Sequence, residues 1–198
     1  TSVYYVMELN GDLTELTDCL QGAFSSGGGG GGGGVWTELV DESVTGVASM
    51  TSATFTAMRY LKVFLAVYDW DGTGNVNHIV RPDNVTDSDY AVMEIYGNGS
   101  GGADWNQRIN QDGLYIISGG GIPTVNTFTE AYLYNEENVE KLWISSSCRS
   151  QEVGSGSAPT AAFYFGKLDQ DPQVTSLTYD FGGSLGTADA RMIVWGSD

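Results

Sequence analysis

The sequence predicts an all-β protein built as an antiparallel β-sandwich. Across residues 35–198, short segments rich in Val, Ile, Thr, Tyr and Phe recur, and these residue types favour strands. Clusters of Gly, Asn and Asp separate the segments and are typical of turns. No helical periodicity lies between them, so we expect roughly ten short strands at a spacing of about 8–15 residues.

The net charge and the apolar content of the chain argue against some classes of binding partner. The chain has 198 residues, with 8 Lys and Arg against 25 Asp and Glu, so its net charge is −17. Phosphate binding depends on Lys and Arg, and the acidic excess therefore argues against a nucleic-acid partner and against a polybasic membrane patch. No apolar stretch approaches the roughly 20 residues that a membrane-spanning helix needs. Hydrophobic residues make up 41% of the chain, enough for a packed core.

The chain divides into an anchor segment at residues 1–24, a Ser/Gly linker at residues 25–34 and a sandwich domain at residues 35–198. The linker holds the glycine run Gly27 to Gly34, which as a free coil spans about 14–17 Å. We interpret it as a tether. Repeat drift in a tolerated loop and ordered polyglycine packing are the alternatives.

The anchor segment contains one candidate helix. Asp12 can act as its N-cap with Glu15 in a capping-box position, and Leu13, Leu16 and Leu20 share one face. A helix of about nine residues is too short to persist alone in water. The leucine face therefore needs a covering surface, supplied by the domain itself or by another protein, and we predict that these leucines anchor the chain to a partner.

The domain is expected to consist of strands throughout. Alternation of apolar and polar residues, as in Leu177, Tyr179 and Phe181, supports this. In chain order, the expected strands are Val35–Val40, Ala53–Ala57, Tyr60–Tyr68, Val76–Val80, Tyr90–Tyr96, Leu114–Ser118, Thr127–Tyr134, Lys141–Ser146, Ala161–Lys167, Val174–Phe181 and Arg191–Trp195.

The segment Tyr60–Tyr68 differs from the others because it is apolar at almost every position. Such a pattern is typical of a strand that is buried on both faces. A two-sheet sandwich buries only one face of each sheet, so the second face needs a covering loop or a neighbouring subunit. We predict a subunit interface at Tyr60, Phe64 and Tyr68, within a homo-oligomer that we expect to be a trimer.

Metal and catalytic motifs are weak. Asp69 to Asn75 resembles the start of a calcium loop, but Val80 stands where the final Glu should be, so a strand-connecting turn is the favoured interpretation. The only histidine, His78, alternates with Val76 and Val80 and is expected to be structural. We predict no metal site, no cofactor and no catalytic residue. We expect Cys19 and Cys148 to be free thiols, and one disulfide between them is the alternative.

A glycan-binding role is a second hypothesis. Trp70, Trp105 and Tyr96 are predicted near loops that carry Asn and Asp. Exposed rings stack on sugars while neighbouring polar groups bind their hydroxyls. The same rings could instead close the ends of the core. Paired acidic residues such as Asp169 and Asp171 would suit glycoside hydrolysis only across a cleft, and they occur in turn-like segments instead.

Ordered landmarks across residues 35–198 carry a family resemblance. They are Val35-Trp36-Thr37-Glu38-Leu39, Arg59-Tyr60-Leu61-Lys62-Val63, Gly74-Asn75-Val76, Asp87-Ser88-Asp89-Tyr90, Glu130-Ala131-Tyr132-Leu133-Tyr134-Asn135, Glu140-Lys141-Leu142-Trp143-Ile144-Ser145, Ala158-Pro159, Gly166-Lys167, Val174-Thr175-Ser176-Leu177 and Ile193-Val194-Trp195-Gly196-Ser197-Asp198.

In this order the landmarks resemble a jelly-roll-like domain of structural proteins from tailed bacteriophages. The resemblance implies a non-enzymatic protein on the virion surface: capsid decoration, a head fibre or a tail fibre. A capsid or tail protein of the same virion would hold residues 1–24, which the resemblance does not cover. A lectin-like module for host glycans and a secreted filament or surface-layer subunit are the alternatives.

Overall fold

The computed structural model describes residues 35–71, 77–86, 89–97, 103–117, 126–149, 159–181 and 186–198. Contacts within Thr37–Asp198 define one compact unit. No helix in these described ranges is long and apolar enough to cross a membrane. The strands are β1 (Thr37–Val47), β2 (Ser49–Thr51), β3 (Tyr60–Tyr68), β4 (His78–Pro82), β5 (Tyr90–Gly97), β6 (Ala103–Gln111), β7 (Leu114–Ile117), β8 (Thr127–Tyr134), β9 (Lys141–Arg149), β10 (Thr160–Leu168), β11 (Leu177–Asp180) and β12 (Ala188–Ser197).

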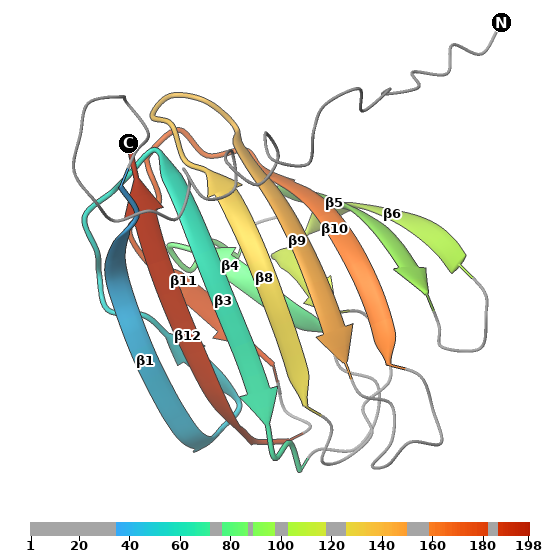
Figure 1. The fold of residues 1–198 in the computed structure, drawn as a ribbon. Coiled ribbons are helices and arrows are strands. Elements are labelled where there is room, and N and C mark those ends of the chain that lie inside the picture. The colour runs from blue at the N-terminus through green and yellow to red at the C-terminus, as the bar shows by residue number, and fades with distance from the viewer. Residues whose placement is uncertain are drawn as a thin grey trace, which may run out of the picture. The chain divides into compact units, whose positions relative to one another are not determined.

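The strands form two antiparallel sheets that pack as two layers (Figure 1). The larger sheet has eight strands in the order β1-β12-β3-β8-β9-β10-β5-β6, and the smaller has four in the order β2-β11-β4-β7. The chain passes between the sheets several times, so most neighbouring strands are distant in sequence. The expectation of an all-β protein with two antiparallel sheets is confirmed for the described residues.

The core lies between the sheets and follows from alternation along each strand. In β3, Leu61, Val63, Leu65 and Val67 point inward and are buried, while the intervening side chains point to the opposite face. The same period-two pattern holds in β8, β9 and β10. The sequence therefore determines which side chains face the core, because a shift of the strand register by one residue would expose the buried side chains.

Two expectations about strands are wrong. Ala53–Ala57 is not a strand; the short strand in this region is Ser49–Thr51, which pairs with β11. The backbone amide of Phe55 instead donates to the carbonyl of Thr175 in an irregular segment. The strand Ala103–Gln111 was not expected, because charged and amide side chains alternate along it. It forms the outer edge of the larger sheet beside β5.

The smaller sheet comes closest to the larger one at its edge strand β7, which contacts β10, β9 and β5. At this contact the hydroxyl of Ser147 on β9 donates to the carbonyl of Ile116 on β7, at 2.5 Å. The guanidinium of Arg108 on β6 lies over the ring of Tyr115, 5.0 Å from its centroid. Beside these contacts, the smaller sheet stops covering the inner face of the larger sheet.

Candidate functional site

The outward face of the larger sheet is unusually apolar. On β8, β9, β10 and β5, every second side chain points inward and is buried, and the alternate ones point away from the core. Eight large apolar side chains of the outward set are 38–53% exposed. We call them the outer apolar face: Phe128, Tyr132, Leu142, Ile144, Phe163, Phe165, Met93 and Ile95.

The strand register makes this surface continuous. Tyr132 pairs with Ile144, Ile144 with Phe165, and Phe165 with Met93, so one apolar row crosses four neighbouring strands. Directly opposite residues in antiparallel strands place their Cβ atoms about 4.5–5.5 Å apart. Neighbouring side chains in the row therefore contact one another, and they form a single surface instead of scattered exposed residues.

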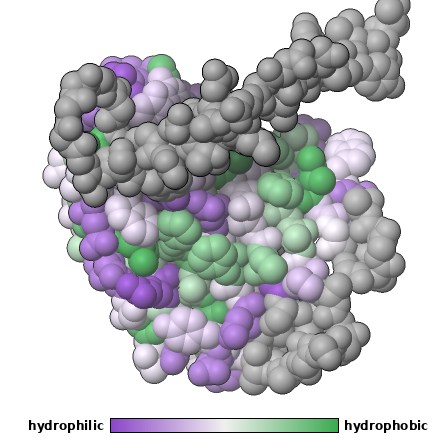
Figure 2. Space-filling view, in the orientation of Figure 1, coloured by the Kyte–Doolittle hydropathy of each residue, from purple (hydrophilic) through white to green (hydrophobic). Residues whose placement is uncertain are grey.

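The area of the outer apolar face is large for a single chain. Each of the four aromatic side chains offers roughly 150–250 Å² of surface, and the four aliphatic ones offer somewhat less. At 38–53% exposure, the eight together leave on the order of 700 Å² open to solvent. The largest apolar patch of a typical monomer is about 300–600 Å². Figure 2 views the molecule from this side and shows hydrophobic side chains gathered over the middle of the sheet.

The outward charged side chains of β8, β9, β10 and β5 are paired within the chain. Lys62 lies 2.9 Å from Glu130, and Lys167 contacts Glu140. Partial burial by itself would raise the pKa of Glu130, but hydrogen bonds from Lys62 and Tyr132 outweigh it and hold that pKa below the usual value. Glu130 therefore stays ionised at neutral pH, and its charge is balanced by Lys62.

The three residues predicted as a subunit interface lie beside this surface. Tyr60 and Tyr68 are exposed and Phe64 is half-buried, all on the outward side of β3. The ring of Phe64 packs edge-on against Trp195 at 5.1 Å between centroids and lies 5.7 Å from the ring of Phe128. Phe64 thus joins β3 to the outer apolar face.

Most of the outer apolar face was not predicted from the sequence. The signal was present, because β9 and β10 also carry apolar residues on both faces: Leu142 and Ile144 outward with Trp143 inward, and Phe163 and Phe165 outward with Tyr164 inward. The criterion applied to Tyr60–Tyr68 identifies these strands as well.

The structure does not bring the three predicted glycan-binding rings together. Trp70 is 2% exposed within the core, whereas Trp105 is 69% exposed on the outward side of β6. Tyr96 points to the opposite side of the sheet, where its hydroxyl lies 3.4 Å from Asp104. These rings therefore do not form one shared platform.

The other predicted residues either make structural contacts or lie outside the described residues. Leu13, Leu16 and Leu20 belong to the second group. Within the calcium-like segment, the carboxylate of Asp71 accepts hydrogen bonds from the amide and hydroxyl of Thr187. Among the described residues, no group of three or more His, Cys, Asp or Glu side chains could hold a metal ion.

Comparison of the chain with protein-family models, curated proteins and solved structures found no match.

Proposed function

We propose that this chain is a non-enzymatic structural protein of a virion surface that assembles with copies of itself through the outer apolar face. The observation that carries the proposal is an apolar, charge-balanced surface on a protein whose net charge is −17. Continuous exposed apolar surface of this size is typical of a protein–protein interface.

A second copy is the occupant that the charges favour. Most of a strongly acidic chain repels an identical chain, and repulsion is weakest where the local charges cancel. On β8, β9, β10 and β5 the outward charged residues are Glu130 and Lys167, each with its own partner. A basic partner would instead be attracted to the acidic remainder of the surface.

The area also suits self-association. About 700 Å² of apolar surface per chain is close to the roughly 800 Å² that each partner buries in a stable protein–protein interface. The side chains predicted as an interface, Tyr60, Phe64 and Tyr68, extend this surface across β3. The proposal includes the trimer expected from the sequence.

The virion location and the jelly-roll class rest on the family resemblance. In this proposal, residues 1–24 bind a capsid or tail protein, residues 25–34 act as the tether, and the acidic sandwich projects outward as decoration, a head fibre or a tail fibre. Two antiparallel sheets with repeated crossings between them support the jelly-roll part of the proposal.

The mass of the purified full chain in solution tests self-assembly. Sedimentation velocity at micromolar concentration should give a particle of three chains. Ile144→Glu places a charge in the middle of the outer apolar face, where the side chain is 51% exposed, and should give monomers with unchanged far-UV circular dichroism. Thr45→Glu adds the same charge at an exposed position of β1 and should remain assembled. A monomeric wild type, or equal assembly of the two variants, would contradict the proposal.

Binding to particles tests the anchor. Leu16→Asp introduces a charge on the predicted leucine face and should abolish association with particles while the domain stays folded. The variant is mixed with particles that lack this protein, and the bound fraction is measured after sedimentation. Full occupancy by Leu16→Asp would show that the anchor lies elsewhere. Long filaments of the purified chain in negative-stain images would favour the surface-layer alternative.

A further inference from the structure

An aromatic groove lies on the outward side of the larger sheet, where β12, β3 and β8 are neighbours. The ring of Phe64 packs against the rings of Trp195 and Phe128, and the open space beside these rings is about 290 Å³. An apolar cavity of about 150 Å³ binds benzene, so this groove has room for a larger ring system. Its lining includes Phe64, Ala66, Phe128, Arg191, Ile193 and Trp195.

The charged side chain in this lining is paired within the chain. The guanidinium of Arg191 on β12 donates two hydrogen bonds to the carboxylate of Asp41 on β1, at 2.9 and 2.7 Å. The groove is otherwise lined by apolar side chains, and it continues the outer apolar face, to which Phe128 belongs. An uncharged, apolar occupant therefore suits it, because such an occupant leaves no buried charge without a partner.

Trp105 provides an occupant of this kind at the other end of the same sheet face. It lies on the edge strand β6 and pairs with Ile95 of the outer apolar face, so both side chains point outward. Its side chain is 69% exposed, more than any other aromatic side chain in the described ranges. The next outward residues along β6, Gln107 and Ile109, are uncharged. Trp is among the residue types most enriched at the energetic centres of protein interfaces.

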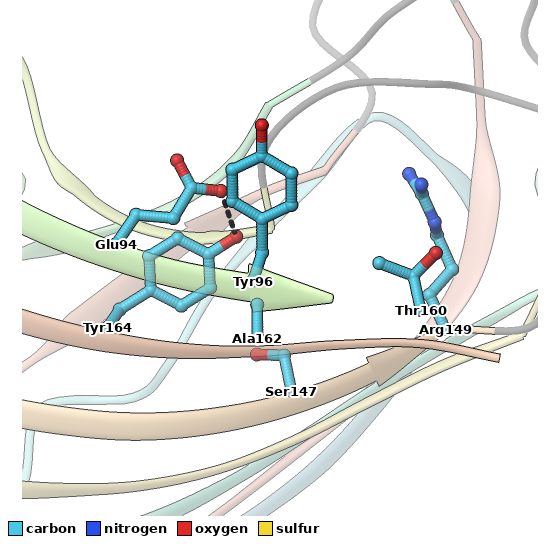
Figure 3. Close-up of a pocket in the computed structure, with 7 residues that line it drawn as sticks. All are labelled: Glu94, Tyr96, Ser147, Arg149, Thr160, Ala162 and Tyr164. Carbon is cyan, nitrogen blue, oxygen red and sulfur yellow. Dashed lines mark hydrogen bonds between the residues drawn. The ribbon is translucent and has the colours of Figure 1, made fainter. Parts of the chain in front are cut away.

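The inner side of the sheet behind β6 has a different character, because it carries a polar cluster of Glu94, Arg149 and Tyr164 (Figure 3). The hydroxyl of Tyr164 donates to Oε1 of Glu94 at 3.1 Å. A guanidinium nitrogen of Arg108, on the inward side of β6, lies 3.7 Å from Oε2 of the same carboxylate. The inward side of β6 is thus engaged within the chain, and its outward side is the one that suits a partner.

The groove and Trp105 of one chain are too far apart to meet. In the order of the larger sheet, β6 lies five strand positions from β3, which at about 4.8 Å per position is about 24 Å. Trp105 can therefore fill only the groove of another copy. A ring of three copies needs two different patches of this kind, since a patch that contacts itself gives a two-fold dimer.

We infer, on the basis of the self-assembly proposed above, that Trp105 of each copy inserts into the aromatic groove of the next copy. The outer apolar faces then turn toward the three-fold axis, and the β6 edge of one sheet meets β12 and β3 of its neighbour. The indole contacts the groove rings in the offset or edge-on geometry that aromatic pairs prefer. This contact specifies the order of the copies, which the apolar face alone does not.

Sedimentation equilibrium of the full chain and its variants tests the contact. Trp105→Ala should raise the dissociation constant of the trimer by about tenfold or more, whereas Trp105→Phe keeps an aromatic ring and should raise it less. Ala66→Phe fills the groove and should weaken assembly as much as Trp105→Ala does. Ala53→Phe adds the same ring at an exposed position outside the outer apolar face and should assemble as wild type does. Far-UV circular dichroism checks that each variant is folded.

The double variant Trp105→Ala/Ala66→Phe separates a direct contact from two independent effects. If the indole occupies the groove, the second change adds nothing, whereas distant sites that act independently add their effects. Additive losses, or assembly of Trp105→Ala at the wild-type level, would overturn the inference and leave the proposed self-assembly in place. Weakening by Ala66→Phe alone would also overturn it, because another segment would then fill the groove. A monomeric wild type would contradict the proposed function and this inference together.

Discussion

His78 is buried in the core, and its Nδ1 lies 3.0 Å from the hydroxyl of Tyr179. Burial, together with the positive charge of Arg149, lowers the pKa of His78 to about 3. The histidine is therefore neutral throughout the physiological range, which agrees with the structural role expected from its strand position. A neutral buried histidine nevertheless leaves a proton-linked effect on stability.

The stability of the wild-type chain should fall with acidification in a way that depends on His78. Unfolded chains take up a proton at this residue near pH 6.5, whereas the native state does so only near pH 3, so the unfolded state binds more protons between these values. The free energy of unfolding should therefore drop by about 2–3 kcal/mol more for wild type than for His78→Gln between pH 7 and pH 4.5. Urea denaturation at both pH values measures this difference, and parallel losses would exclude the linkage.

Lys141 is a second buried ionisable residue, at 0% exposure. Its ammonium group donates to the carbonyls of Glu136, Val139 and Asp171. These carbonyls belong to two connections that follow β8 and β10, so one side chain holds both in place.

Replacing Lys141 with Met should lower the free energy of unfolding by about 2–4 kcal/mol, because three carbonyls lose a charged donor. Lys167→Met is the matched control: its exposed ammonium contacts Glu140 and should contribute little. Thermal and urea denaturation of the two variants make the comparison. Equal stability of both variants would mean that the Lys141 contacts add nothing.

At the scale of elements, the sequence was most informative where strand propensity is high along a whole segment. The bounds of Tyr60–Tyr68 and Thr127–Tyr134 were predicted correctly, because each segment is rich in β-branched and aromatic residues. The strand Ala103–Gln111 was not predicted, because the polar residues Asp104, Asn106 and Arg108 occupy successive positions on its inward side. That side lies at the sheet edge, where apolar residues are not required.

The outer apolar face and the polar cluster on the opposite side of the sheet differ in how far sequence could predict them. Apolar residues on both faces of a strand indicate an uncovered sheet face, and this signal identified Phe64. The placement of Glu94, Tyr164 and Arg149 on one face of the larger sheet depends on the pairing of β5, β10 and β9. Glu94 and Arg149 are 55 positions apart by their residue numbers, and no local pattern connects them.

Gly196 on β12 is required by packing between strands and a loop. A Cβ atom added there would lie 2.5 Å from Cγ of Met58 and 2.7 Å from Cδ1 of Leu39. Gly196→Ala should therefore lower the free energy of unfolding by about 1–3 kcal/mol, through displacement of the Met58 segment. Ser43→Ala, at an exposed position of β1, serves as the control. Unchanged urea midpoints for Gly196→Ala would show that Met58 and Leu39 adjust freely.

At the scale of the whole molecule, the net charge of −17 opposes the proposed self-assembly. Salt shortens the Debye length from about 30 Å at roughly 0.01 M to about 3 Å at 1 M, and so weakens repulsion between like-charged chains. Association measured by sedimentation should therefore strengthen as NaCl rises across this range. Dissociation at high salt would instead indicate an interface held by ion pairs between chains, contrary to an apolar contact.

The pairing of β1 with β12 has a mechanical consequence. Thr37 is the partner of Gly196, so the two ends of the sandwich lie side by side at one edge of the larger sheet. A force that pulls these ends apart opens the ladder one hydrogen bond at a time, which resists far less than shearing all of them at once. Load that enters at Thr37 reaches the rest of the larger sheet through this same ladder, because β1 is the edge strand and β12 is its neighbour there.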